Sequence, residues 1–383
     1  MTRRLVILTE IISPYRIPLF NALALHEGVS LHVIFLAETD PNLRQWQVYK
    51  EEIKFSYQVL PSWRRRFGRF NVLLNRGVGR ALTAVTPDAI LCGGYNYLAS
   101  WQALHWARTC SIPFLLWSES NLQDSRRGFT VVEFLKNEFL RKCTAFVVPG
   151  SSAHKYLRAH KIQDSVIFTA PNAVDNSLFA AGAAAARQDS SARRRELSLP
   201  NRYFLFVGRL VREKGVFELL SAYAKLDAQV RQQIGLLFVG DGPSRRQLEE
   251  QAASISPGEI KFAGFARREQ LATYYALAEM LILPTYTDTW GLVVNEAMVC
   301  GLPVILSRAA GSAADLVKEN WNGLLIPPHD VASLALAMEN LSSHRDLCTT
   351  MGANSTLLIS NYSPTEWSLG IAHAVQSVGG PRA

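Results

Sequence analysis

The segment of residues 284–305, PTYTDTWGLVVNEAMVCGLPVI, holds the residues whose spacing is most informative about chemistry. Asp288 precedes and Glu296 follows Gly291, a residue that is expected to open a helix. A helix start has unpaired backbone amides and a partial positive charge, so it binds phosphate groups. Carboxylates on either side of it can flank one ligand, although Asp288 can equally be a helix cap and Glu296 a surface residue. The stretch around Glu296 is apolar, and a buried charge there is costly without a partner, which favours a ligand.

A second cluster, FVGRLVREKGV at residues 206–216, lies directly after an apolar run that predicts a strand. Gly208 permits a tight turn, Arg209 can form forked hydrogen bonds to phosphate oxygens, and Lys214 adds a second positive charge before the next helix. Two cations in one strand-to-helix loop fit a diphosphate. The alternative is that both are solvated loop charges.

Two further loops follow predicted strands in the same way. The loop GDGP begins with Gly240 and Asp241, but Arg245 stands where a dinucleotide fingerprint has its last glycine, so a nicotinamide dinucleotide site is poorly supported. In KFAGFARREQLATYY, which starts at Lys261, Phe265 comes after a short strand, where a flat base can lie against the backbone and the ring.

Short apolar runs alternate with helix-period segments along the chain, which predicts parallel strands buried on both faces. The predicted strands are residues 5–9, 31–36, 89–92, 114–117, 145–148, 166–168, 203–207, 236–239, 260–262, 280–283, 303–306 and 323–326. The predicted helices are residues 18–27, 97–109, 131–142, 151–160, 216–226, 244–253, 268–277 and 291–300. The expected fold class is α/β, with two doubly wound, Rossmann-like parallel-sheet domains.

The domain boundaries follow from length and composition. The 383 residues exceed the roughly 250 to 300 residues at which single hydrophobic cores stop growing. We predict a first domain at residues 1–175, an exposed linker at 176–201 rich in Ala, Ser and Arg, and a second domain at 202–362. A helix at about residues 363–377 is expected to pack back on the first domain. Ligands bind beyond the carboxyl ends of parallel strands, so two facing domains would form a cleft.

Taken together, the motifs resemble the nucleotide-binding half of the retaining glycosyltransferases of family 4, also called glycosyl transferases group 1. They are PNAVD at residues 171–175, GRLVREKG, VGDGP, FAGF and DTWGLVVNEAMVCGLPVI, in this order. The resemblance is strong over about residues 165–330 and weaker before them. It implies the GT-B fold, which is two facing Rossmann-like domains with an interdomain cleft. It also implies a metal-independent hexosyl- or related transferase that uses a nucleotide-diphosphate sugar.

The resemblance further implies roles for single residues. Arg209 and Lys214 would hold the donor diphosphate and offset the charge of the leaving group. Asp288, which stands where relatives commonly have Glu, would face the donor sugar. Glu296 would accept hydrogen bonds from ribose hydroxyls, and the backbone near Phe265 would contact the base. The other donor-binding residues lie in glycine loops or at the helix start: Gly208, Gly240, Asp241, Trp290, Gly291, Leu292 and Val293.

Two departures from the family pattern fall in the first domain. The first loop, TEIISPYRIP, lacks the glycines of many relatives, so Pro14, Tyr15 and Arg16 are expected to shape the acceptor side. Relatives often carry a histidine after a central strand, and here Glu119 is the expected catalytic substitute. The alternative for Glu119 is a helix cap or a loop carboxylate paired to one of the arginines at positions 126 and 127.

The net charge of +8 is unevenly distributed. Residues 1–172 hold 21 basic and 12 acidic side chains, whereas residues 173–383 hold 19 and 20. The densest basic cluster, SWRRRFGRFNVLL at residues 62–74, interleaves arginines with aromatic rings from Trp63 to Phe70. Such a surface fits an anionic membrane that carries a lipid-linked acceptor, and the alternative is a solvated basic loop. No recognised nucleic-acid module accompanies it, so no nucleic-acid partner is expected.

Composition limits the class of protein further. Hydrophobic residues make up 48% and charged residues 19%, which is typical of folded globular proteins. Five widely spaced cysteines without a C-x-x-C pair argue against a disulfide framework or a zinc site and fit a reducing cytoplasm. The first apolar run is interpreted as a buried strand rather than an export signal, and no stretch is long enough to span a bilayer. We expect no metal, no cofactor, and a cytoplasmic protein that contacts the membrane at most peripherally.

The leading hypothesis is transfer of a sugar from a UDP-, GDP- or dTDP-sugar to a glycan or a polyprenyl-diphosphate-linked acceptor, as in bacterial polysaccharide or glycoconjugate synthesis. A second hypothesis is a nucleotide-sugar epimerase or hydrolase of the same fold. A third is a catalytically weak nucleotide-sugar-binding protein. The sequence leaves the base, the sugar, the acceptor, the linkage and the oligomeric state open.

Overall fold

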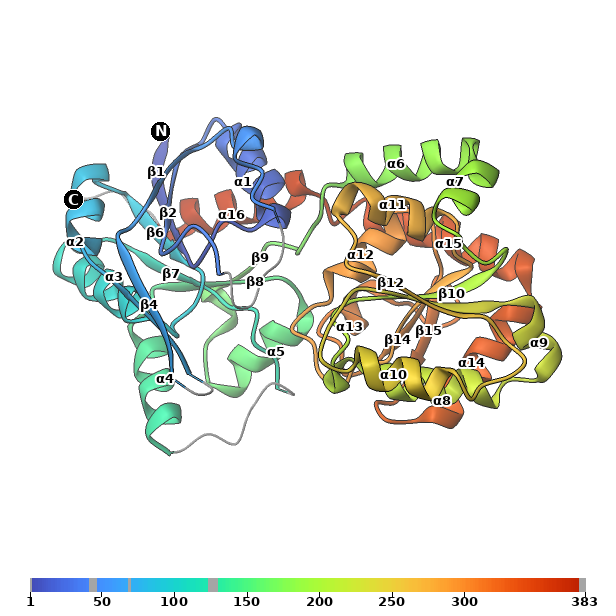
Figure 1. Ribbon diagram of the computed structural model, residues 1–383. Coiled ribbons are helices and arrows are strands. Elements are labelled where there is room, and N and C mark those ends of the chain that lie inside the picture. The colour runs from blue at the N-terminus through green and yellow to red at the C-terminus, as the bar shows by residue number, and fades with distance from the viewer. Residues whose placement is uncertain (1, 41–46, 68–69, 123–129, 379–383) are drawn as a thin grey trace. The chain divides into compact units, whose positions relative to one another are not determined.

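The computed structural model describes residues 2–40, 47–67, 70–122 and 130–378 of the chain (Figure 1). The chain divides into two compact units. The first consists of Met1–Val174 and Ser363–Ala383, and the second of Asp175–Tyr362. Each unit is built on its own parallel sheet.

The first unit contains a seven-stranded sheet in the order β3-β2-β1-β6-β7-β8-β9, and its neighbouring strands pair in parallel. The strands are β1 (Arg3–Thr9), β2 (Val29–Phe35), β3 (Ser56–Val59), β6 (Ala89–Cys92), β7 (Phe114–Trp117), β8 (Ala145–Val148) and β9 (Ile167–Thr169). The central strands β6, β7 and β8 are buried along their whole length, as expected for a sheet covered on both faces.

Helices cover both faces of this sheet. One hydrophobic core joins the sheet to α2 (Val78–Val85), α3 (Leu98–Thr109), α4 (Thr130–Lys142) and α5 (Ser151–Ala159). The other core joins it to α1 (Ile17–Ala24) and α16 (Pro364–Val378). Trp367 of α16 is fully buried, with its ring 5.8 Å from Phe20 and 5.2 Å from Trp117. The last helix of the chain is therefore an integral part of the first unit.

An antiparallel hairpin of β4 (Ser62–Phe67) and β5 (Phe70–Asn75) also lies in the first unit and was not predicted from sequence. Trp63 pairs with Leu74, and Arg64 pairs with Leu73. Because successive side chains of a strand point to opposite faces, the hairpin has an inner face with the buried Leu73 and an outer face with Trp63 and Leu74. The arginine run concealed this alternation in the sequence.

The second unit contains a six-stranded parallel sheet in the order β12-β11-β10-β13-β14-β15. Its strands are β10 (Tyr203–Val207), β11 (Gly235–Val239), β12 (Ile260–Gly264), β13 (Met280–Leu283), β14 (Val304–Ser307) and β15 (Gly323–Ile326). Its helices after β10 are α8 (Val216–Lys225), α9 (Ala228–Gln233), α10 (Arg245–Ala252), α11 (Arg268–Ala276), α12 (Leu292–Val299), α13 (Ala313–Leu316), α14 (Val331–Ser343) and α15 (Arg345–Ile359).

The prediction of an exposed linker at residues 176–201 is wrong. These residues form α6 (Asn176–Gln188) and α7 (Ser190–Glu196) within the second unit. Phe179 of α6 is buried, and a Cβ atom on Gly182 would lie only 2.7 Å from the Cβ of Ala272 in α11. The small residues of this segment therefore allow close helix packing, whereas their composition alone had suggested the absence of a core-forming pattern.

Each sheet has a point at which the strand order reverses. It lies between β1 and β6 in the first unit and between β10 and β13 in the second. In open parallel sheets, loops at the carboxyl ends of the two strands diverge at such a switch point and leave a crevice for ligands. Both crevices contain residues that were singled out from the sequence.

Candidate active site

The switch point of the second unit brings together two of the predicted site residues. The loop after β10 carries Lys214, the loop after β13 carries Asp288, and the ammonium group donates a hydrogen bond to Asp288 Oδ2. The two side chains are 19% and 15% exposed. Residues 74 positions apart in the chain thus form a partly buried ion pair. Such a pair loses part of its Coulomb gain to desolvation, so its main effect is to fix two charges at a defined place.

Backbone contacts hold these two loops against each other. The Tyr286 amide donates to the Glu213 carbonyl at 2.9 Å, and the Thr285 hydroxyl donates to the same oxygen at 3.0 Å. Gly215 ends the short 3-10 helix η4 (Arg212–Lys214) with φ at 69°, and a Cβ atom there would lie 2.1 Å from the Pro284 carbonyl oxygen. Only glycine fits at this position, because both the space and the backbone conformation exclude a side chain.

The helix α12 begins directly beside the ion pair. Gly291 is its N-cap, with φ at 89°, and the Trp290 amide donates to Asp288 Oδ1 at 3.4 Å. The Trp290 side chain is buried, and its indole N–H donates to Asn295 Oδ1 at 2.9 Å, so this ring anchors the helix start rather than lining an open site. The amides of the next two residues, Leu292 and Val293, lie in the first turn and have no intrahelical acceptor.

Glu296 lies one turn further into α12, and its carboxylate accepts a hydrogen bond of 2.7 Å from the Tyr275 hydroxyl. Burial raises the pKa of Glu296 to about 7, and the hydrogen bond from Tyr275 only partly opposes this shift. The carboxyl group is consequently divided between its neutral and ionised forms near neutral pH. Its proposed contact with ribose remains a prediction.

Glycines join the loops that follow the other strands. The Gly240 amide donates to the Gly264 carbonyl at 2.7 Å, and a Cβ atom on Gly240 would lie 1.9 Å from the Gly208 carbonyl oxygen. Asp241 accepts the amide of Gly242 at 2.7 Å through Oδ1. The loops after β10, β11 and β12 thus form one continuous backbone surface. Arg209 is exposed on the first of these loops.

One residue of this surface was not assigned from the sequence. Arg245, which stands at the missing last glycine of the fingerprint, pairs with Glu249 at 2.8 Å and lies 3.7 Å from Asp241. A Cβ atom on Gly264 would approach its guanidinium to 3.3 Å, so the arginine lies beside the loop where the base was expected. The neighbouring ring of Phe265 is half exposed. The sequence feature that could have pointed to Arg245 is a charged residue at a position where the fingerprint has a glycine.

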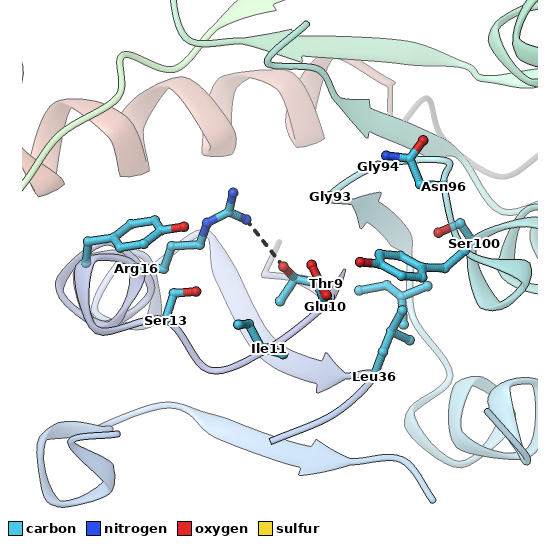
Figure 2. A pocket seen from close by; sticks show the side chains of 13 residues that line it. Thr9, Glu10, Ile11, Ser13, Arg16, Leu36, Gly93, Gly94, Asn96 and Ser100 are labelled. Atoms are coloured by element: carbon cyan, nitrogen blue, oxygen red, sulfur yellow. Dashed lines mark hydrogen bonds between the residues drawn. The ribbon is translucent and has the colours of Figure 1, made fainter. Parts of the chain in front are cut away.

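The switch point of the first unit contains a polar cavity of about 150 Å³. Its lining comes from the loop after β1, the loop after β6 and the start of α3: Thr9, Glu10, Tyr15, Arg16, Gly93, Asn96, Tyr97 and Ser100 among others. Figure 2 shows Arg16 on one side of this space and Gly94 with Asn96 on the other. The predicted Tyr15 and Arg16 line the cavity, whereas Pro14 is buried and begins the 3-10 turn η1 (Pro14–Arg16).

Several contacts hold Arg16 in place. Its guanidinium donates to the Thr9 hydroxyl at 3.3 Å (Figure 2), lies 4.2 Å from the centre of a Trp117 ring, and is 3.7 Å from Glu119. The structure therefore joins two residues, Arg16 and Glu119, that were predicted separately. The alternative partners of Glu119 at positions 126 and 127 lie outside the described residues.

Glycines missing from the first loop are present in a neighbouring one. Gly93 and Gly94 follow β6, and the Gly93 amide donates to the Leu8 carbonyl of β1 at 2.8 Å. A Cβ atom on Gly93 would lie 3.2 Å from the Thr9 hydroxyl oxygen. This pair forms the close backbone wall that the first loop lacks. The two glycines are evident in the sequence, but only the pairing of β6 with β1 brings them next to the first loop.

The basic cluster at residues 62–74 differs from the expected amphipathic surface in one important respect. Arg64 is only 12% exposed and forms ion pairs with Asp40, which is 1% exposed, and with Glu10 at 3.5 Å. Its charge is therefore neutralised inside the unit and does not contribute to a membrane-facing surface. Trp63, at 49% exposure, does lie outside. Positions 68 and 69 of the cluster are outside the described residues.

Within residues 2–40, 47–67, 70–122 and 130–378, no group of three or more His, Cys, Asp or Glu side chains could hold a metal ion. In the same residues no helix combines the length and the apolar character needed to cross a bilayer.

Solved structures with the same arrangement define the fold class. Sucrose-phosphate synthase from Thermosynechococcus elongatus superimposes with a TM-score of 0.74 at 21% identity, over 97% of this chain and 98% of that one. Anabaena Alr3699/HepE, solved in complex with UDP and glucose, superimposes with a TM-score of 0.75 at 17% identity, over 98% and 100%. The fold is therefore GT-B, with two Rossmann-like parallel-sheet domains, as the sequence predicted.

Sequence comparison relates the second unit to glycosyltransferases. Residues 188–357 match the model described as Glycosyl transferases group 1. D-inositol 3-phosphate glycosyltransferase of Corynebacterium kroppenstedtii is 33% identical over 47% of this chain and 41% of its own length. GDP-mannose-dependent alpha-mannosyltransferase of Corynebacterium glutamicum is 33% identical over 54% and 47%. The chain thus spans less than half the length of these curated relatives.

Proposed function

We propose that the protein is a retaining glycosyltransferase of family 4, which transfers a sugar from a nucleotide-diphosphate sugar to a glycan or lipid-linked acceptor. The observation that carries the proposal is the Lys214–Asp288 pair at the start of α12, beside the backbone surface of Gly208 and Gly240. The match of residues 188–357 to the glycosyl transferases group 1 supports it. Retention of configuration rests on the resemblance to family 4.

The proposed chemistry is electrostatic. Cleavage of the bond between the sugar carbon and the diphosphate leaves a dianion, and donors placed where that charge develops lower the barrier. In this proposal Lys214, the exposed Arg209 and the first-turn amides of Leu292 and Val293 would supply positive charge and N–H donors to the diphosphate. No cofactor and no metal ion take part in this scheme.

Asp288 has two tasks in the proposal. Before the donor binds, it accepts the hydrogen bond of Lys214 and neutralises the ammonium charge. When the diphosphate arrives, Lys214 turns to the phosphate oxygens and Asp288 becomes available to the hydroxyls of the donor sugar. The shorter aspartate side chain keeps the carboxylate within reach of the Trp290 amide at 3.4 Å.

A UDP-, GDP- or dTDP-sugar is the proposed donor. Relatives differ in this respect: one is a GDP-mannose-dependent mannosyltransferase, and a structural neighbour was solved with UDP-glucose. The proposed base site lies between Arg245 and the half-exposed Phe265.

A donor panel tests the proposed function directly. Thermal shift with UDP, GDP and dTDP and their sugars identifies the nucleotide, and the wild-type protein is compared with Lys214→Ala. Nucleotide release only in the presence of a glycan or lipid-linked acceptor supports transfer. Release without an acceptor supports a hydrolase, an isomerised donor without release supports an epimerase, and binding without turnover supports a binding protein. No response to any nucleotide would contradict the proposal.

The acceptor is proposed to be a glycan or a polyprenyl-diphosphate-linked sugar, reached at the cytoplasmic face of a membrane. The outer face of the hairpin supports peripheral binding, because Trp63 and Leu74 are paired across the strands and are 49% and 41% exposed. The neighbouring Arg65 is also exposed. An aromatic side chain and a cation on one face fit the headgroup region of an anionic bilayer.

A further inference from the structure

A charge network lies behind the cavity of the first unit and outside the proposed donor site. Glu10 follows β1 directly, lines the cavity (Figure 2), and is about one third exposed. One of its carboxylate oxygens lies 3.5 Å from a guanidinium nitrogen of Arg64, and the Tyr97 hydroxyl donates a hydrogen bond to the carboxylate. Glu10 is thus held by two groups, from β4 and from the start of α3, while its remaining surface faces the cavity.

Arg64 reaches Glu10 from the hairpin. It lies on the inner face of β4, opposite the buried Leu73, whereas its exposed neighbours Trp63 and Arg65 lie on the outer face. The second nitrogen of its guanidinium pairs with the almost fully buried Asp40. The guanidinium group is therefore held between two carboxylates, one at each terminal nitrogen. A shift of the hairpin would move this group relative to Glu10.

The chemistry of the cavity indicates what it binds. Arg64 is shared between two carboxylates, and Arg16 is engaged by Glu119 and Trp117, so Glu10 presents a carboxylate without an excess of positive charge around it. A carboxylate accepts hydrogen bonds from hydroxyl groups and repels phosphate. About 150 Å³ corresponds to roughly five water molecules at ~30 Å³ each, which is room for part of a sugar ring.

We propose that Glu10 binds the hydroxyl groups of an uncharged sugar at the acceptor end, and that Arg64 of the β4–β5 hairpin is the residue that positions it. This inference rests on the proposed function, since it names the acceptor chemistry of the same enzyme. The arginines of the hairpin then have two separate roles. Arg64 on the inner face positions Glu10 in the sugar subsite, and the outer face remains available to contact a membrane.

The test uses ligand-observed NMR with the full-length chain and uncharged probes, methyl glucoside, methyl mannoside and N-acetylglucosamine, against glucose 6-phosphate. We expect saturation transfer to at least one uncharged sugar and none to the phosphate. Glu10→Gln, which leaves the Arg64–Asp40 pair intact, should weaken binding about tenfold, the effect of losing a hydrogen bond to a charged group. Arg64→Met should weaken it similarly, and Arg64→Lys should restore part of the loss.

Arg65→Met is the matched control, because it removes the adjacent arginine from the opposite face and should leave sugar binding unchanged. Binding of UDP or GDP, measured in parallel, should be equal in all four variants. Failure of the wild-type protein to bind any nucleotide would contradict the proposed function. If nucleotide binding is normal, the sugar measurements test the Glu10 proposal by itself. An unchanged sugar signal in Glu10→Gln, or equal losses in Arg64→Met and Arg65→Met, would overturn the proposal. Binding of glucose 6-phosphate alone would also overturn it.

Discussion

The two switch points of the molecule are built in different ways. In the second unit the crevice is formed mainly by backbone: glycines at the ends of β10, β11 and β12 approach within hydrogen-bonding distance, and one ion pair lies beside a helix start. In the first unit the crevice is lined mainly by side chains from the end of β1, the loop after it and the start of α3, and Arg64 of β4 pairs with one of them, Glu10. Backbone surfaces suit the invariant part of a substrate, such as a diphosphate, and side-chain networks suit the part that differs between enzymes.

The largest expected effect concerns the glycines. In Gly240→Ala the new Cβ atom would lie 1.9 Å from the Gly208 carbonyl oxygen, so the strands' loops must separate. We expect a loss of about 3 kcal/mol in the stability of the second unit, at the upper end of overpacking effects. In Gly93→Ala the closest atom is the Thr9 hydroxyl oxygen at 3.2 Å, which can move, so the loss should be below about 1 kcal/mol. Scanning calorimetry of the thermal unfolding of both variants gives the two losses of stability. Equal losses would contradict the contrast between the two sites.

The next effect concerns the cations. Lys214→Ala should reduce sugar transfer by at least about a hundredfold and leave the protein folded, because a charge-stabilising group is removed from the leaving group. Lys50→Ala is a suitable control, since Lys50 forms an exposed ion pair with Glu38 in the first unit. Initial rates at saturating donor give the comparison. Normal turnover in Lys214→Ala would contradict the proposal that Lys214 binds the donor diphosphate.

The third effect is a pH dependence that belongs to the second unit. Because the pKa of Glu296 is raised to about 7, the native protein holds this proton more tightly than the unfolded chain. Its contribution to stability is therefore present below the unfolded pKa of about 4.3 and is lost as the pH rises through about 7. If ribose binding needs the carboxylate, UDP or GDP affinity changes in the opposite sense and falls about tenfold one pH unit below the pKa.

Glu296→Gln tests this pair of opposite trends. The variant should lose the pH dependence of nucleotide affinity between about pH 6 and 8 while retaining its fold. Calorimetric titration at three pH values gives the affinity, and melting at the same values gives the stability. A wild-type affinity that does not change over this range would count against the ribose contact.

The smallest expected effect separates the two faces of the hairpin. Trp63→Ala on the outer face should change stability by less than about 0.5 kcal/mol, as exposed positions usually do, but should weaken sedimentation with anionic liposomes. Vesicles of phosphatidylcholine with and without phosphatidylglycerol provide the measurement. Equal binding of the wild-type protein to neutral and anionic vesicles would contradict the proposed membrane surface. It would not affect the proposed role of Arg64, which the sugar-binding experiment tests.

Much of the fold could be predicted because its signals are local. Buried parallel strands are continuous apolar runs, so β6, β7, β8, β10, β13 and β15 begin and end where the sequence predicts. The glycine loops and the Asp288 to Glu296 segment were likewise visible, since each is a short motif after a strand. The hairpin was missed because arginines concealed its alternation, and the helical character of residues 176–196 was missed because small residues concealed the helix packing. The short, largely polar strand β3 was also missed.

The sequence by itself determined the two α/β units, the glycine-loop motifs of the second unit and the excess of positive charge in the first half. Only the tertiary structure decided the partners of the charged side chains: it pairs Lys214 with Asp288, joins Arg16 to Glu119, and turns Arg64 inward to Asp40 and Glu10. The physical reason is that a motif after a strand fixes backbone conformation locally, whereas the partner of a charged side chain depends on strand order and on burial. Those are properties of the folded chain, set by residues far apart in sequence.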